Sequence, residues 1–193
     1  DEEKAKNIVK EFYGEDKIEN INSNGYSENA EIPSFDFSVK MKESDITATI
    51  SIAKKGGHVI FANYNKTVNA ETISQEKADE IGKQFLDAHG YKDMKETYYL
   101  KQNGVVTINY AYSQTAQNGE KVVIYPDLIK LKVALDDGSV LGIETTGYLN
   151  SHHTRDIATN LITKEEAKKV LNKQLEIQSE NLAIIPTKWK TEI

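Results

Sequence analysis

The 193-residue sequence contains no cysteine, which excludes disulfide bonds and thiolate metal sites. Such a chain suits a reducing cytosol and a cysteine-poor bacterial envelope equally well, so the compartment stays open. The sequence also lacks an apolar run of the roughly 18–20 residues that a membrane-spanning helix needs. Its start, Asp1-Glu2-Glu3-Lys4, does not have the charge pattern of a signal peptide. This acidic start without methionine suggests a processed or excised chain, whose parent could carry an anchor or an export signal.

The sequence also has no excess of positive charge. The 24 Lys and Arg residues stand against 30 Asp and Glu residues, which gives a net charge of −6 and a sequence pI near 5.3. A nucleic-acid backbone or an anionic lipid surface would be repelled by this charge. The length leaves room for two or three modules of about 50–100 residues, each burying a modest core, rather than one large domain.

The usual catalytic and phosphate-binding motifs are absent as well. There is no Gly-x-Ser-x-Gly string, no P-loop and no His-Glu-x-x-His. The glycines of Gly56-Gly57 and Asp137-Gly138 join strands to strands, as turn glycines do. The acidic pairs Asp136-Asp137 and Glu165-Glu166 fall in a hairpin turn and in the first turn of a helix, where negative charge is favoured. We therefore expect no catalytic residue and no bound cofactor.

The histidines are the only metal-ligand candidates. His152 and His153 are adjacent, with Glu144 nearby and His58 and His89 elsewhere in the chain. Adjacent side chains point to opposite sides of an extended backbone and stand about 100° apart on a helix, so one metal ion rarely takes both. We interpret this stretch as a polar linker without a metal. The alternative is a metal-dependent hydrolase that uses His152 or His153.

A capped amphipathic helix recurs three times along the chain. Asp1, Ser74 and Thr163 each stand where an N-cap is expected, and the first two helical patterns stop at Gly14 and Gly90. The alanines are offset by 73 (78 − 5) and 89 (167 − 78), which is typical of an internal repeat. The apolar stripes are Ala5-Ile8-Val9-Phe12, Ala78-Ile81-Phe85 and Ala167-Val170.

Alternating strands follow the first two helices. After a polar stretch containing Asn24-Gly25, residues 35–41 and 46–52 alternate between apolar and polar, and Gly56-Gly57 then turns the chain into Val59-Ile60-Phe61. In the second copy, Asn103-Gly104 gives the best hairpin signal and Asp137-Gly138 closes the last hairpin. Pro126 predicts a break or an edge position, because proline cannot donate to a ladder. The predicted strands of this copy cover residues 98–100, 105–112, 122–124, 129–133 and 140–143.

These patterns predict an α+β fold of tandem modules, each a helix packed on an antiparallel β-sheet. We expect module one at 1–70, module two at 71–150, a connector at 151–162 and an incomplete module three at 163–193. The closing glycines Gly57 and Gly138 are offset by 81 rather than 73, so we expect a longer loop in module two. Module three has room for one helix and one strand through Trp189. We expect this unit to be frayed, docked on module two or paired with another chain.

Tyrosines suggest a contact surface. Tyr98, Tyr99, Tyr110, Tyr112 and Tyr125 all fall on predicted strands of module two. In a regular pleat some of them lie on the face away from the helix, where tyrosine suits contact with a protein or a glycan. The alternative is that they are ordinary strand formers between core and water.

The capped helix, the strands and the apolar-Asp-Gly-x-apolar closing hairpin resemble the PepSY module at 74–144 and, more loosely, at 1–63. The connector string 145–155, Thr-Thr-Gly-Tyr-Leu-Asn-Ser-His-His-Thr-Arg, is more specific. Together with Ile162-Thr163 and the string 185–192, Ile-Pro-Thr-Lys-Trp-Lys-Thr-Glu, it resembles the C-terminal region of the YpeB family of spore germination proteins.

This resemblance implies three PepSY modules in series, carried outside the inner membrane of a bacterial spore by an N-terminal membrane helix. It implies a non-enzymatic protein, needed for the presence and control of the cortex-lytic enzyme SleB. PepSY units also resemble inhibitory pro-segments of secreted peptidases, so regulation of a peptidase is the alternative. Tyr148, His152 and Arg155 lie in the family-like connector, where they either contact a partner or lock module two to module three. An unfinished third module could also form a homo-oligomer.

Overall fold

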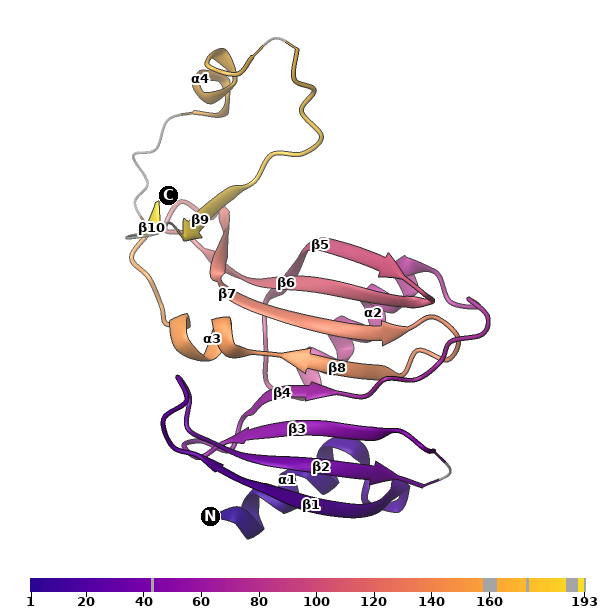
Figure 1. Cartoon of the computed structure of the whole chain (residues 1–193). Coiled ribbons are helices and arrows are strands. Elements are labelled where there is room, and N and C mark those ends of the chain that lie inside the picture. The colour runs from indigo at the N-terminus through magenta and orange to yellow at the C-terminus, as the bar shows by residue number, and fades with distance from the viewer. Residues whose placement is uncertain (43, 158–162, 173, 187–190, 193) are drawn as a thin grey trace.

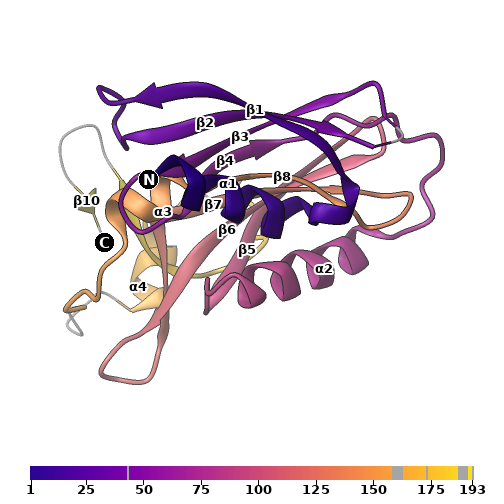
Figure 2. The ribbon, with the colours of Figure 1, turned by 90° about the horizontal axis from the view of Figure 1, so that it is seen from below.

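A computed structural model describes residues 1–42, 44–157, 163–172, 174–186 and 191–192. Figures 1 and 2 show one broad twisted sheet with the two long helices on the same face, α1 over the first four strands and α2 over the later ones. The helices are α1 (Glu2–Tyr13), the 3₁₀ turn η1 (Glu15–Lys17), α2 (Gln75–Ala88), α3 (Thr146–Ser151) and α4 (Lys164–Lys169). The strands are β1 (Ile18–Ser27), β2 (Ser34–Met41), β3 (Thr47–Ala53), β4 (Val59–Asn63), β5 (Met94–Gln102), β6 (Val105–Thr115), β7 (Lys121–Ala134), β8 (Val140–Glu144), β9 (Leu182–Pro186) and β10 (Thr191–Glu192).

Both long helices begin where the sequence predicts. The Asp1 side chain accepts a hydrogen bond from Lys4 N at 2.9 Å, and the Ser74 side chain accepts one from Lys77 N at 3.2 Å. Helix α2 packs close to the sheet at Gly82, where any Cβ would overlap the Tyr110 hydroxyl. The expected combination of a capped helix and an antiparallel sheet is therefore confirmed in both copies.

The sheet order is β1-β2-β3-β4-β8-β7-β6-β5, so two four-stranded meanders meet edge to edge. Strands β4 and β8 pair antiparallel through three residue pairs. One row of partners crosses the whole sheet on the helix side, and its inner members are buried. That row is Ser23, Phe37, Ile50, Ala62, Ile143, Leu131, Ile108 and Tyr99.

The two copies share one core, which differs from the expectation of a modest core in each module. The buried side chains of α1, such as Val9, and of α2, such as Leu86, belong to one contiguous apolar cluster. The cause is the β4–β8 ladder, which places Ala62 beside Ile143 across the junction. Phe12 of α1 also meets Phe85 of α2 edge to face, with ring centroids 5.9 Å apart. The division at residue 70 stays a proposal drawn from the repeat.

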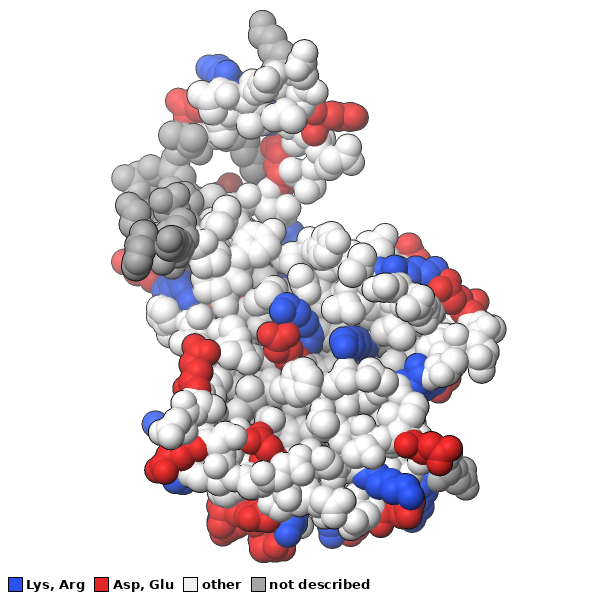
Figure 3. All heavy atoms as spheres, in the orientation of Figure 1, with Lys and Arg blue, Asp and Glu red and all other residues white. Residues whose placement is uncertain are grey.

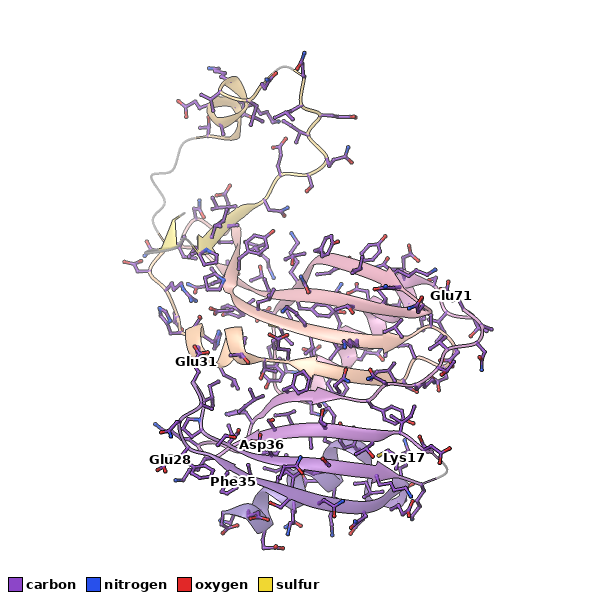
Figure 4. The ribbon with its side chains drawn as sticks, in the orientation of Figure 1. Lys17, Glu28, Glu31, Phe35, Asp36 and Glu71 are labelled. Carbon is purple, nitrogen blue, oxygen red and sulfur yellow. The ribbon has the colours of Figure 1, made fainter. Side chains whose placement is uncertain are left out.

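Further contacts tie the first meander to the start of the connector. The Thr145 hydroxyl donates to Val59 O at 2.7 Å, and Thr145 N donates to Ile60 O at 2.9 Å. Asn150 Nδ2 of α3 donates to Glu31 Oε1 at 2.8 Å, and Figure 4 shows Glu31 beside α3. Helix α3, which the sequence pattern did not reveal, thus ends the stretch expected as module two and reaches the first residue of the expected connector, Ser151.

The sequence pattern also missed β1. This strand holds the stretch around Asn24-Gly25 and has irregular pairing at two places, between Ile18 and Asn20 and between Ser23 and Gly25. Most of its residues are exposed, because it lies at the edge of the sheet. A strand with both faces largely solvated does not need the apolar alternation by which strands are found.

The extra residues of module two lengthen strands rather than a loop. Strands β6 and β7 have 11 and 14 residues, whereas β2 and β3 have 8 and 7. The expected break at Pro126 is a bulge within the long strand β7. Between the pairs Tyr112–Ile124 and Ala111–Leu128, residues 125–127 have no partner in the β6 ladder.

The third unit is docked on module two, one of the three expected alternatives. Strand β9 pairs in parallel with residues 122–124 of β7. Ile184 of β9 joins Ile124 and Ile157 in a second small apolar cluster. The predicted capping box of α4 is present, with Thr163 and Glu166 bonded to each other's backbone N–H groups. Ile162 and Trp189 lie outside the described residues.

The hydrogen bonds of Thr145 to β4 predict that this residue stabilises the fold. Thr145→Val keeps the shape of the side chain but removes the donor to Val59 O, so we expect a loss of about 1–2 kcal/mol in the free energy of unfolding. Urea titration followed by circular dichroism measures this loss. Thr49→Val, at an exposed strand position, is the matched control and should change stability by less than about 0.5 kcal/mol. Equal effects of the two substitutions would contradict the role assigned to Thr145.

Candidate functional site

On the face of the sheet opposite α1 and α2, one row of paired residues crosses eight strands. We call it the polar row. Seven strand spacings of about 4.8 Å give it a length of about 34 Å. Its members are mostly small amides and hydroxyls. They are Asn22, Ser38, Thr49, Asn63, Gly142, Lys132, Thr107 and Leu100.

A second row lies beside it on the same open face, and we call it the mixed row. It brings two exposed aromatic side chains onto this face, Phe61 at 41% and Tyr98 at 59% exposure. It also holds two acidic residues and one basic residue, of which Glu144 and Lys130 form an ion pair. Its members are Asp36, Ser51, Phe61, Glu144, Lys130, Asn109 and Tyr98.

The two rows of the open face carry as many acidic as basic residues. Lys130 Nζ lies 3.1 Å from Glu144 Oε2, whereas Lys132 Nζ donates to the neutral amide oxygen Asn63 Oδ1 at 2.8 Å. Partial burial opposes the ionised form of Asp36, but hydrogen bonds from serine hydroxyls outweigh it and lower the pKa of this carboxyl. Figure 3 shows this face as mainly uncharged, with one small group of opposite charges in the middle and the remaining charges near its rim.

A groove of about 370 Å³ opens on this face at the end of the polar row. The segment after β4 and the β5–β6 hairpin form its walls, and Leu100, Thr107 and Lys132 of the polar row contribute to its lining. The other lining residues are Tyr64, Asn65, Lys66, Gln102, Asn103, Val105 and Leu141. Its walls therefore combine apolar area with amide and hydroxyl groups.

Asp127 forms the centre of a second candidate site. Its side chain is fully buried, and Arg155 donates to both carboxylate oxygens, at 2.7 Å from Nη2 and 3.0 Å from Nη1. His152 Nδ1 lies 2.8 Å from Oδ2 of the same carboxylate. The His152 ring stacks on Tyr148, with centroids 4.2 Å apart. Of the three connector residues singled out by sequence, His152 and Arg155 thus bind one carboxylate and Tyr148 packs on His152; we call this cluster the Asp127 network.

The bulge in β7 explains why Asp127 points into this network. Residues 125–127 leave the β6 ladder, so the strand bends and the side chain of Asp127 turns toward α3 and Arg155. Sequence analysis did not select Asp127. The available signal was an acidic residue directly after Pro126 and between two apolar strand segments.

The remaining histidines and Glu144 do not join His152. His153 is exposed and bonds the backbone oxygen of Ser151, while Glu144 pairs with Lys130 on the open face. His89 stacks on Phe85 with ring centroids 4.0 Å apart. Within the described ranges, no three His, Asp or Glu residues are placed to hold a metal ion.

Tyr148 stays protonated over the neutral pH range. Burial, followed by the negative charge of Asp127, raises the pKa of its phenol to about 12. The ring therefore acts as a neutral platform for His152. Together with Arg155, it favours the second reading of the connector, in which these residues lock the chain beyond β8 onto β7.

The strand tyrosines have different environments, and Tyr125 lies in the β7 bulge without a partner in the β6 ladder. Tyr98 lies on the open face, as expected for some of them, whereas Tyr99 lies on the helix side and is 45% exposed. Tyr110 is buried, and its hydroxyl donates to Asp79 Oδ1 at 2.9 Å. Tyr112 packs edge to face against His152, with centroids 4.6 Å apart.

Asp79 and Glu96 form a carboxylate pair that sequence analysis missed. Burial and the charge of Asp79 raise the pKa of Glu96. Asp79 is already bonded by Tyr110 and paired with Lys83 at 2.5 Å. This engagement favours a structural role, because the oxygens that a reaction would need are occupied.

Glu96→Gln should stabilise the protein at neutral pH. The folded-state pKa of Glu96 is raised, so its ionised form is disfavoured in the native state, and the cost disappears as pH falls through that pKa. We expect a gain of roughly 0.5 kcal/mol at pH 7 that vanishes near pH 4. Urea unfolding at several pH values tests this. Glu28→Gln, at the β1–β2 turn labelled in Figure 4, should show no such gain; a gain independent of pH would contradict the assigned cause.

Asp127→Asn should weaken the attachment of the connector. It leaves Arg155 without its anionic partner in a largely buried position, which should cost about 3 kcal/mol. Thermal unfolding and limited proteolysis between residues 151 and 157 measure the change. Asp156→Asn, at an exposed neighbouring position, is the control. Unchanged stability and unchanged cleavage in Asp127→Asn would refute the locking role.

Two helix-covered antiparallel meanders, the second closed by an Asp-Gly hairpin, define a tandem PepSY-type α+β protein. The family model described as YpeB sporulation, PepSY1 and PepSY2 domains matches residues 1–158. The chain therefore belongs to the YpeB family of sporulation proteins.

Relatives support this membership. The chain is 30% identical over 197 residues to the sporulation protein YpeB of Bacillus subtilis, covering all of this chain and 42% of the relative. It is 29% identical to that of Halalkalibacterium halodurans, covering 75% of this chain and 31% of the relative. The chain thus spans less than half the length of these relatives. The solved Bacillus megaterium YpeB C-terminal domain matches with a TM-score of 0.85 and 26% identity, over 98% of this chain and 82% of that one.

No helix in the described part of the chain is both long enough and apolar enough to span a membrane.

Proposed function

We propose that this chain is part of a non-catalytic sporulation protein that binds the cortex-lytic enzyme SleB and stabilises, localises or restrains it during spore germination. The match of residues 1–158 to the YpeB family carries this proposal. The parent protein would hold this region on the outer side of the spore inner membrane, near the cortex, through an N-terminal anchor. Because the chain spans 42% of its Bacillus subtilis relative, the role belongs to the complete protein.

The side-chain arrangement supports a binding role rather than catalysis. The side chains best suited to catalysis are His152, Arg155 and Asp127. They are engaged with one another through a hydrogen bond and an ion pair. What the fold offers to a protein partner is surface, above all the third unit with exposed Val170, Leu171 and Leu175. An enzyme held by such a surface would be protected without any chemical step.

A direct binding experiment tests this proposal. The 193-residue chain should co-purify with SleB and slow its digestion by a general protease. A secreted hydrolase of similar charge that does not act on spore cortex is the matched control and should not be retained. Failure to retain SleB, together with unchanged SleB proteolysis, would reject the proposed partnership.

Regulation of a peptidase is the second candidate, because the matched family model describes PepSY domains and such modules resemble inhibitory pro-segments. This function would place the same surfaces against a peptidase instead of SleB. Peptidase inhibition assays on secreted enzymes of the same spore separate the two. Inhibition at stoichiometric amounts, without SleB binding, would favour this second candidate.

A further inference from the structure

We propose that the open face of the sheet is a binding surface for an extended, uncharged oligosaccharide. Four strand partners at one end of the polar row are neutral amides or hydroxyls, namely Asn22, Ser38, Thr49 and Asn63. Such groups both donate and accept hydrogen bonds, as sugar hydroxyls and acetamido groups do. A row of this composition can follow a sugar chain along its whole length.

Charge complementarity selects the class of ligand. The chain carries a net charge of −6, whereas the two rows carry two acidic residues, Asp36 and Glu144, and two basic residues, Lys130 and Lys132. A polyanion would meet the negative field of the whole molecule, and Lys130 is already paired with Glu144. A polycation would find Glu144 paired and Asp36 hydrogen-bonded by Ser27 and Ser34. A neutral polymer meets neither penalty.

Aromatic platforms supply the apolar part of the recognition. Phe61 and Tyr98 lie in the mixed row four strand spacings apart, which is about 19 Å. Both side chains are exposed on a rigid sheet, so they offer ring faces to the C–H faces of sugar rings at low entropic cost. Between them lies Asn109 of the same row. This spacing suits a chain of several sugar units rather than a single sugar.

The groove at the end of the polar row provides a place for one sugar unit with its substituents. Leu100 and Tyr64 give it apolar area, while Gln102 and Thr107 add polar groups. Its volume of about 370 Å³ lies within the range of small-molecule sites. The groove continues the polar row, because Thr107 and Leu100 belong to both.

A protein partner fits this face less well. The centre of a protein interface is depleted of charge and rich in contiguous apolar area. Here a Lys130–Glu144 ion pair lies between the two aromatic platforms, so no large apolar patch forms around it.

The test compares two neighbouring tyrosines that point to opposite faces of β5. Titration of the 193-residue chain with N-acetylglucosamine hexamer, followed by NMR shifts and calorimetry, should show saturable binding. Tyr98→Ser should weaken binding about two- to tenfold, as loss of one aromatic contact predicts. Tyr99→Ser, on the helix side, should leave the affinity unchanged. Unfolding curves for both variants show whether the fold is kept.

Every other outcome overturns the proposal. These outcomes are no saturation by the hexamer at millimolar concentration, equal weakening by both substitutions, or equal binding of polygalacturonate and of the neutral hexamer. A protein that competes for this face in the absence of any hexamer binding would assign the face to a protein partner. SleB binding is measured in a separate experiment. A failure of the oligosaccharide to bind would therefore not count against the proposed function.

Discussion

The short β4–β8 ladder is the interaction on which the rest of this architecture depends. Three residue pairs join two four-stranded meanders into one sheet, and the close approach requires a glycine. A Cβ at Gly142 would lie 2.7 Å from the backbone oxygen of Ala62, which is closer than such atoms approach. Backbone bonds from Tyr64 to Leu141 and from Thr145 to Ile60 extend the ladder at both ends. Without this junction the shared core would split, and the polar row would be interrupted in its middle.

The β4–β8 ladder joins the two meanders, and the Asp127 network joins the connector string 145–155 to β7. A buried carboxylate is costly unless it is paired and hydrogen-bonded, and here a bidentate arginine and a histidine meet that need. Such pairing fixes the course of the backbone more than it adds net stability, because apolar side chains of similar volume can stabilise a buried site equally well. The network holds His152 and Arg155 against β7, and β9 pairs with another part of the same strand. Residues that looked chemical in the sequence are therefore engaged in holding the connector string on β7.

Local signals in the sequence predicted the local parts of the fold. Capping serines and acids, Asn103-Gly104 and Asp137-Gly138 each determine a few neighbouring dihedral angles, and the helices and hairpins follow them. The parts that were missed depend on distant residues. β1 is an edge strand without apolar alternation, and the β4–β8 pairing joins segments about 80 residues apart in sequence. The environment of Asp127 depends on the bulge in β7 and on His152 and Arg155, which follow 25 and 28 residues later.

The way the sheet edges are protected favours the open face as the surface presented to a partner. β1 has two pairing irregularities, and residues 122–124 of β7 are paired with β9. β5 has one irregularity near its middle, between Glu96 and Tyr98, and Lys95 and Lys101 toward its ends. Irregular pairing and lysines are the usual means of preventing strand addition at an edge. A fold that blocks its edges but leaves one whole face uncovered and neutral is suited to recognition by that face, and the β4–β8 junction gives the face its length.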